Sequence, residues 1–363
     1  MIMEHPENSE EYKGLTVNSG VTEAPMVNPY LTRRVKPKTL TVDDYVEGIL
    51  AGNRTILSRA ITLVESNLPE HQEVAQQVIE RCLPHSGKSI RIGITGVPGA
   101  GKSTFIEALG MYLCHDSHKL AVLAIDPSSE RTKGSILGDK TRMEELSVEK
   151  NAFIRPSPSA GSLGGVARKT RESIVLCEAA GFDTVIVETV GVGQSETAMH
   201  SMVDFFLLIQ LAGTGDELQG IKRGIMEMAD GITINKCDGN NIEKAQLAQR
   251  QFQNALHLFP MPESGWTPKV TTCSAFEKLN IDKVWQMVED YIAFTSKSGY
   301  FDYKRNQQSK YWMYETINGT LLDNFYRNEK MEALIKQAEQ QVLDNQVSSF
   351  IAAHNLLTEY GKL

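Results

Sequence analysis

Residues 93–104, GITGVPGAGKST, contain residue types that can hold a phosphate. Gly96 is followed by four residues and then by Gly101-Lys102-Ser103, which is the spacing of a P-loop. Glycine lets such a loop curl tightly, so that a row of backbone N–H groups can meet phosphate oxygens. Lys102 adds a compact positive charge for the β- and γ-phosphates, and the Ser103 hydroxyl is suited to Mg²⁺. The predicted phosphate-binding residues are Gly96, Val97, Pro98, Gly99, Ala100, Gly101, Lys102, Ser103 and Thr104.

The residues on either side of this loop predict the elements that must position it. Ser89–Thr95 is a short β-branched run typical of a buried strand, and residues 104–109 continue as a helix. A P-loop requires this order of strand, loop and helix, because the positive end of the helix points at the anion. A chance glycine-rich turn is the alternative, and it accounts for neither the full spacing nor the two flanks.

A second stretch, Asn235-Lys236-Cys237-Asp238, follows a predicted strand and bears on which base is bound. The Asp238 carboxylate can accept from the ring N–H and the exocyclic amine of guanine, a donor pair that adenine lacks. A comparable bidentate contact to a base edge discriminates by roughly 1–3 kcal/mol. Asn235 and Lys236 would tie this loop to the P-loop and cover the base, so the sequence favours GTP over ATP and over a chance polar loop. The backbone N–H groups expected to reach the guanine oxygen belong to Ser274, Ala275 and Phe276.

Glu188 ends another predicted strand and is a candidate partner of Mg²⁺. P-loop NTPases hold Mg²⁺ through a carboxylate at this place, usually an Asp. The Gly191 N–H would sense the γ-phosphate, and residues 192–196 would form a mobile switch. A strand-end acid that caps the next helix is the alternative for Glu188.

Asp126 also ends a predicted strand and is the best candidate for a second carboxylate near Mg²⁺ or the attacking water. Asp139 is a weaker candidate for the same role. Arg131 and Lys133 could neutralise transition-state charge, although exposed loop charges are more often solvated. The predicted catalytic residues are Lys102, Asp126, Glu188 and Gly191, and the predicted Mg²⁺ ligands are Ser103, Asp126 and Glu188.

Composition limits the class of protein. A formal net charge of −8 over 363 residues argues against nucleic acid as the main partner. No run of roughly 18 or more apolar residues occurs, so neither a transmembrane helix nor a membrane partner is expected. The acidic N-terminus resembles neither a signal peptide nor a transit peptide, which favours a cytoplasmic protein. The 5 cysteines are widely spaced without a CxxC pair, as in proteins with reduced thiols.

The order of strand and helix patterns predicts four parts. Residues 1–39 are polar and loosely ordered; residues 40–87 are helical, with a helix start at Thr41 and a second helix over Glu70–Cys82. Residues 88–295 alternate strands and helices, as in a doubly wound α/β domain with a mostly parallel sheet. Residues 296–363 are helical with a thin apolar stripe that includes Trp312, so they should pack on the main domain or on a second copy. The other predicted strands are Lys119–Asp126, Ala152–Ile154, Thr184–Val190, Asp204–Leu211, Gly231–Asn235 and Val270–Cys273, and the predicted helices between them include Gly165–Ala180 and Ile242–Leu258.

The stretches GVPGAGKST, AIDPSS, ETVGVGQSE, GDELQGIKRGIMEMAD and NKCD occur in this order. With them the chain resembles, over roughly residues 30–330, the MeaB/ArgK family of GTPases in the SIMIBI class of P-loop proteins. The resemblance implies a homodimer formed by a C-terminal helical arm, with an N-terminal helical extension. It also implies a third switch over residues 215–224, with Asp216, Glu217 and Lys222 as its polar members.

The same resemblance implies a partner and a task. Such GTPases bind an adenosylcobalamin-dependent acyl-CoA mutase, with methylmalonyl-CoA mutase as the first candidate here and isobutyryl- or ethylmalonyl-type relatives as the alternatives. They gate cofactor loading and protect the mutase from inactivation. No Gln directly follows Gly191 and Gln194 is distant, so hydrolysis of GTP to GDP and phosphate should be slow alone and faster with the partner.

Two other classes stay open on the sequence. A nickel-delivering metallochaperone GTPase would share the core, but the only metal-like spacing is the HxxH of His115 and His118. Polar residues between a helix and the next strand explain this pair more simply. A kinase is the third possibility, against which the Asp238 motif argues because it selects guanine.

Overall fold

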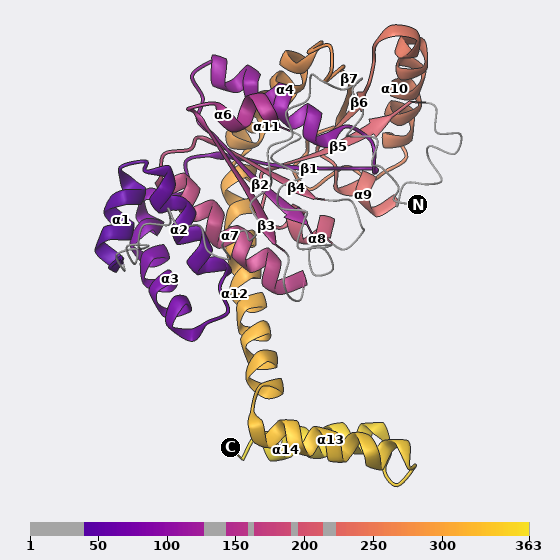
Figure 1. Ribbon diagram of the computed structural model, residues 1–363. Coiled ribbons are helices and arrows are strands. Elements are labelled where there is room, and N and C mark those ends of the chain that lie inside the picture. Colours follow the sequence, from indigo (N-terminus) through magenta and orange to yellow (C-terminus); the bar gives the residue numbers. More distant parts are fainter. Residues whose placement is uncertain (1–39, 127–142, 159–162, 190–194, 213–222, 363) are drawn as a thin grey trace, which may run out of the picture. The chain divides into compact units, whose positions relative to one another are not determined.

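The computed structural model describes residues 40–126, 143–158, 163–189, 195–212 and 223–362 (Figure 1). Residues 41–363 form one compact unit. Its centre is a parallel seven-stranded sheet in the order β3-β2-β4-β1-β5-β6-β7. The strands are β1 (Ile90–Gly96), β2 (Leu120–Asp126), β3 (Ala152–Pro158), β4 (Thr184–Thr189), β5 (Phe205–Leu211), β6 (Gly231–Asn235) and β7 (Lys269–Thr272). The doubly wound α/β fold predicted from the sequence is therefore confirmed.

Helices cover both faces of the sheet (Figure 1). On one face, α4, α6 and α11 build the main hydrophobic core with the strands. On the other face, α7 and α8 contact β1, β2 and β4. Strands covered on both faces are continuous apolar runs, and Phe205–Ile209 of β5 is fully buried. These helices are α4 (Lys102–His115), α6 (Glu144–Val148), α7 (Leu163–Ala179), α8 (Ser195–His200), α9 (Arg223–Met228), α10 (Ile242–Leu256) and α11 (Ile281–Ser298).

Strand β3 is longer than the Ala152–Ile154 predicted from the sequence. It pairs with β2 in register as far as Asp126 and Pro158. Pro156 and Pro158 interrupt the strand pattern in the sequence, but an edge strand tolerates proline because one side of it has no ladder to complete. The extension brings the end of β3 level with the end of β2.

The N-terminal helical region consists of α1 (Val42–Leu50), α2 (Arg54–Glu65) and α3 (Pro69–Cys82). A capping box between Thr41 and Asp44 starts α1, as the sequence predicted. The helix ends before Gly52, whose φ of 72° breaks the helical run, and Asn53 caps α2. Both α2 and α3 pack on α7, where Lys169 Nζ donates to the Glu65 carbonyl at 2.7 Å.

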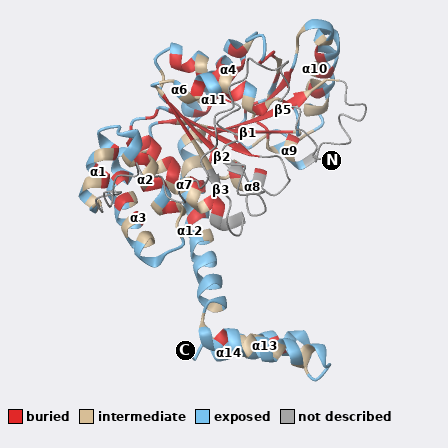
Figure 2. Ribbon diagram, viewed as in Figure 1, coloured by how far each residue is buried: buried red, intermediate tan, exposed pale blue. Residues whose placement is uncertain are grey.

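The C-terminal region consists of α12 (Tyr300–Tyr326), α13 (Glu329–Leu343) and α14 (Ser349–Tyr360). Only Gln308 and Trp312 of α12 are buried among its described residues. Figure 2 shows that the second half of α12, and most of α13 and α14, are mainly exposed. Trp312 of the predicted stripe thus packs on the main domain through the first half of α12.

Helix α10 lies against the edge strand β7. Gln249 Nε2 donates to the Val270 carbonyl at 2.8 Å, and the Val270 N–H donates to Gln253 Oε1 at 3.3 Å. Both backbone groups of Val270 are therefore bonded to side chains of α10.

Candidate nucleotide-binding site

The described site residues gather at the carboxyl edge of the sheet. Because all strands are parallel, the carboxyl ends of β1, β4, β6 and β7 lie there. The P-loop runs directly from the end of β1 at Gly96 to the start of α4 at Lys102. This is the strand–loop–helix order expected from the sequence.

Two glycines of the P-loop are required by close backbone approach. A Cβ on Gly96 would lie 2.2 Å from the Ile209 carbonyl oxygen of β5, and one on Gly101 would lie 2.8 Å from Asn235 Nδ2. Gly101 also has a φ of 83°, a region that side chains disfavour. The loop is thus held tightly between β5 and the Asn235 side chain.

Lys102 folds back over the loop. Its Nζ donates to the Gly96 carbonyl at 3.0 Å and to the Val97 carbonyl at 3.5 Å, and the side chain is buried. Burial lowers the pKa of Lys102, while the charges of Glu188 and Glu196 oppose that shift. The ammonium group is therefore buried under the influence of two carboxylates, those of Glu188 and Glu196.

Ser103 and Glu188 come together although they belong to different elements. The Ser103 hydroxyl, in the first turn of α4, donates to Glu188 Oε1 at 3.3 Å. Glu188 is buried near the end of β4, between Ile94 of β1 and Ala124 of β2. A hydroxyl and a carboxylate are oxygen ligands of the kind that Mg²⁺ prefers, so this pair fits the predicted cation site.

Other predicted members of this half of the site are described in part or not at all. Asp126 ends β2, whose residue Ile125 pairs with Thr189 of β4, so its backbone reaches the same edge. The following predicted residues and segments lie outside the described residues: Gly191, Gln194, Arg131, Lys133, Asp139, residues 192–194 and residues 215–222, with Asp216, Glu217 and Lys222.

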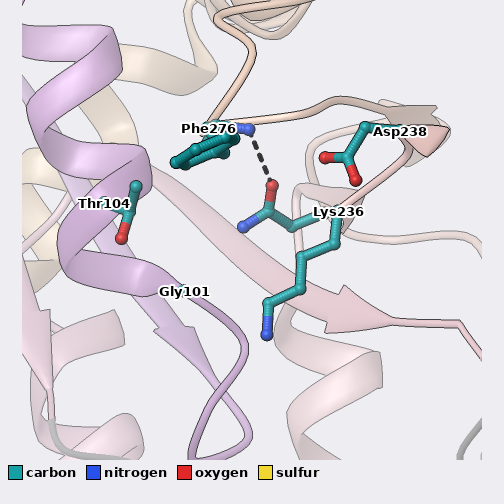
Figure 3. Close-up of a pocket in the computed structure, with 7 residues that line it drawn as sticks. Gly101, Thr104, Lys236, Asp238 and Phe276 are labelled. Atoms are coloured by element: carbon teal, nitrogen blue, oxygen red, sulfur yellow. Dashed lines mark hydrogen bonds between the residues drawn. The ribbon is translucent and has the colours of Figure 1, made fainter.

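Asn235 joins the phosphate half of the site to the base half. Its side chain is buried, Nδ2 donates to the Ala100 carbonyl at 2.8 Å, and Oδ1 accepts from the Ala275 N–H at 3.0 Å (Figure 3). The amide thereby fixes the P-loop, the end of β6 and the loop after β7 to one another. The predicted tie between the two motifs is present.

Asp238 is held by the loop after β7. Its Oδ2 accepts from the Ser274 hydroxyl, which in turn accepts from the Glu277 N–H at 3.1 Å. Ser274 and Leu279 exchange two backbone hydrogen bonds that close this loop. The Asp238 carboxylate is therefore oriented by a rigid neighbour.

A cavity of about 310 Å³ opens between these elements, and Figure 3 shows its lining. The first turn of α4, the loop after β6 and the loop after β7 all contribute. Phe276 stands at the rim with 81% of its surface exposed. The lining residues are Gly101, Thr104, Asn235, Lys236, Asp238, Ala275 and Phe276, all but the glycine and threonine from the predicted base half.

The N–H groups predicted to reach the guanine oxygen have different surroundings. Those of Ser274 and Ala275 donate to the Leu279 carbonyl and to Asn235 Oδ1. The Phe276 N–H has no hydrogen-bond partner among the described residues. Contact with a guanine oxygen therefore stays a prediction, for which Phe276 has the available donor.

One charged residue near the phosphate half was not assigned there from the sequence. Glu196, which the sequence predicts to be part of a mobile switch, lies in the first turn of α8, is buried, and acts electrostatically on Lys102. Only its position a few residues beyond Glu188 could have suggested this.

Two features that would indicate other classes of protein are absent from the described residues. No group of three or more His, Cys, Asp or Glu side chains suited to a metal occurs in the described part of the chain. The His118 ring instead bonds to Asp183 Oδ1 at 3.0 Å. Across the described ranges, no helix combines the length and apolarity needed to cross a bilayer.

Comparison with known proteins shows the family. The family model described as methylmalonyl Co-A mutase-associated GTPase MeaB matches residues 57–330. GTPase ArgK of Escherichia coli K12 is 46% identical over 308 residues, covering 85% of this chain and 93% of that protein. The mitochondrial methylmalonic aciduria type A homolog of Mus musculus is 44% identical over 329 residues, covering 88% and 79%.

A solved structure and a further relative support the same family. The crystal structure of a LAO/AO transport system kinase superposes with a TM-score of 0.70 at 39% identity, covering 89% of this chain and 98% of that one. A probable GTPase of Mycobacterium tuberculosis is 49% identical over 317 residues, covering 87% and 94%. The chain has the P-loop and the Asp238 motif, and these matches show that it belongs to the MeaB family of methylmalonyl-CoA mutase-associated GTPases.

Proposed function

We propose that this protein binds and hydrolyses GTP in the cavity beside Thr104 and uses that cycle to assist an adenosylcobalamin-dependent acyl-CoA mutase. Methylmalonyl-CoA mutase is the first candidate, since the family carries its name. The observation that carries the proposal is the Asn235 side chain. By bonding to both Ala100 and Ala275, it sets a phosphate-binding loop and a carboxylate suited to guanine at a fixed separation.

The phosphate half would act mainly by positioning and by charge. The P-loop N–H groups and Lys102 hold the leaving diphosphate, and the Gly191 N–H contacts the γ-phosphate. Ser103 and Glu188, with Asp126, are the residues that would hold Mg²⁺, which when bound neutralises charge on the β- and γ-phosphates. Burial of Lys102 and Glu188 strengthens these electrostatic contacts, because little water screens them.

The base half would select guanine. Asp238, oriented by Ser274, accepts from the two donors on the guanine edge, and the Phe276 N–H donates to the guanine oxygen. The Lys236 stem and the Phe276 ring border the same cavity and would cover the faces of the base. Adenine would leave the partly buried carboxylate without the two donors of the guanine edge, which is costly.

Hydrolysis by the protein alone should be slow, and the mutase should accelerate it by ordering the groups around the attacking water. Added catalytic groups in GTPases are worth about 10³–10⁵ in rate. In the cell, this cycle would gate cofactor loading and protect the mutase from inactivation.

The test is GTP hydrolysis by the purified protein with and without the methylmalonyl-CoA mutase of the same genome. A rise in rate with the mutase supports both the nucleotide and the partner. An unchanged rate, with GTP bound in preference to ATP, would contradict the proposed mutase partner but not the proposed GTPase activity. Asp238→Asn serves as the control that separates guanine-specific turnover from contaminating phosphatase.

We further propose a homodimer formed by the C-terminal helices and a cytoplasmic location. Support for the dimer is the exposed apolar surface of these helices, on which Leu343 is 75% and Phe350 is 85% exposed. Support for the location is that all 5 cysteines are free thiols, as in reducing compartments. Analytical ultracentrifugation that finds only monomer at micromolar concentration would contradict the dimer.

A further inference from the structure

Three side chains of α12 donate hydrogen bonds to the main chain of residues 200–204, the segment that joins α8 to β5. Lys304 Nζ donates to the Asp204 carbonyl at 2.7 Å. Gln308 Nε2 donates to the Val203 carbonyl at 2.8 Å and to that of His200 at 3.5 Å. Trp312 Nε1 donates to the Ser201 carbonyl at 3.0 Å. Their four-residue spacing places them on one face of the helix, and we name them the α12 stripe.

The segment that the stripe holds comprises the last residue of α8 and the residues that follow it. Helix α8 follows β4, the strand that carries Glu188, and its first turn contains Glu196, whose charge acts on Lys102. Its Met199 packs on the P-loop strand, since a Cβ on Gly93 would lie 3.1 Å from that side chain. One end of α8 therefore faces the phosphate half of the site and the other end meets α12.

Gln308 and Trp312 of the stripe are the only buried residues of α12 among its described residues. Arg171 of α7 adds hydrogen bonds to the Gln308 carbonyl and to Ser309 Oγ, both at 3.0 Å. Gln308 Oε1 is a buried acceptor without a hydrogen-bond partner in the described part of the chain. Hydrogen bonds therefore join α12 to α7 and to the end of α8. The buried Gln308 Oε1 could accept a hydrogen bond from a new donor if the packing changed.

We propose that the α12 stripe positions α8 for GTP hydrolysis and couples the nucleotide site to the C-terminal helices α13 and α14. This rests on the proposed GTPase cycle. GTPase switch segments change their order or position when the γ-phosphate is lost. Because the stripe binds backbone carbonyls, α8 can shift at its end only if these bonds break or α12 moves with it.

If α12 moves with α8, the displacement reaches the C-terminal helices α13 and α14. The helix is continuous over 27 residues, and its exposed half leads directly into α13. Coupling between two sites is reciprocal. A partner that binds α13 and α14 therefore changes the conformational equilibrium of α8. In turn, exchange of the bound nucleotide changes the surface that α13 and α14 present to a partner.

Trp312 provides the first test, because it is one of 3 tryptophans and its indole N–H belongs to the stripe. The fluorescence of wild type minus that of Trp312→Phe isolates its emission while Trp266 and Trp285 stay in place. We expect this difference spectrum to shift between GDP and a non-hydrolysable GTP analogue. An identical spectrum with both nucleotides bound would overturn the coupling and leave the GTPase intact, whereas failure of both nucleotides to bind would overturn the proposed function as well.

Gln308→Met provides the second test, since methionine has similar length but no donor. Exposed Gln307→Met on the same helix is the matched control. For Gln308→Met we expect kcat for GTP to change by about five-fold or more while KM stays within about two-fold, and we expect no change for Gln307→Met. Equal kcat in both variants would overturn the positioning role, and if Gln308→Met fails to fold, the Trp312 spectrum decides.

Discussion

The Ser103 hydroxyl lies 3.3 Å from Glu188 Oε1, which joins the first turn of α4 to the end of β4. The two residues are far apart in the sequence and belong to separate motifs. Their contact places a neutral oxygen and a charged oxygen side by side at the buried end of the P-loop. The Glu188 carboxylate is thereby held by its neighbours before any cation arrives.

Glu188→Gln should reduce Mg²⁺-dependent GTP hydrolysis by roughly 10–100-fold, because the amide keeps the shape but removes the charge. The measurement is kcat as a function of Mg²⁺ concentration. Glu243→Gln, exposed at the start of α10, is the control and should match wild type. A Glu188→Gln protein with an unchanged Mg²⁺ dependence would assign the cation to other residues.

Asp238→Asn should weaken GDP binding by roughly 1–3 kcal/mol, because an amide presents donors where guanine presents donors. Xanthosine diphosphate carries an acceptor at that edge, so its affinity should rise in the same variant. Isothermal titration with both nucleotides measures the change of preference. Loss of both affinities together would show that the Asp238 carboxylate supports the loop through Ser274 and does not read the base.

Gly96→Ala and Gly99→Ala should differ although both change the P-loop. At Gly96 the new methyl meets the Ile209 carbonyl oxygen at 2.2 Å, so β1 and β5 must separate, at about 3 kcal/mol of unfolding free energy. At Gly99 no described atom lies within 4 Å, and only its φ of 79° is unfavourable, at about 1 kcal/mol. Chemical denaturation of both variants is the measurement, and equal losses would contradict the tight approach at Gly96.

Whether a structural feature can be predicted from the sequence depends on where the interacting residues lie along the chain. The P-loop, Asn235 and Asp238 were predictable because each motif is contiguous and its chemistry is local. The break between α1 and α2 at Gly52 and Asn53 was not predicted, because the helical periodicity continues across it. By contrast, Gln308 reads as one more polar residue of a helix, since its partner His200 is brought to it only by tertiary packing.

Protonation of His200 should make the protein less stable in acid. Burial lowers its pKa to about 4 from 6.5, an effect that the charge of Lys304 reinforces. Between pH 6.5 and 4 the unfolded chain binds this proton and the folded chain does not, so stability falls as the pH falls, by about 2 kcal/mol at pH 4.5. His200→Gln should flatten the dependence of unfolding free energy on pH in this window.

Exposed His85→Gln is the control for that measurement and should keep the wild-type slope. A wild-type slope that persists in His200→Gln would attribute the acid sensitivity to other groups. The ring also meets Phe206 edge to face at 5.6 Å, so the variant will lose some stability at every pH, and the comparison rests on the slope alone.

The two glutamines of α10 that bond to Val270 have a consequence for self-association. A strand at the border of a sheet offers its unpaired N–H and C=O groups as a template on which strands of other chains can assemble into aggregates. Gln249 and Gln253 occupy that template at Val270 with side chains of the same molecule. Helix α10 thus prevents a strand of a neighbouring molecule from pairing with β7 at Val270, on the strand that leads into the cavity-lining residues Ala275 and Phe276.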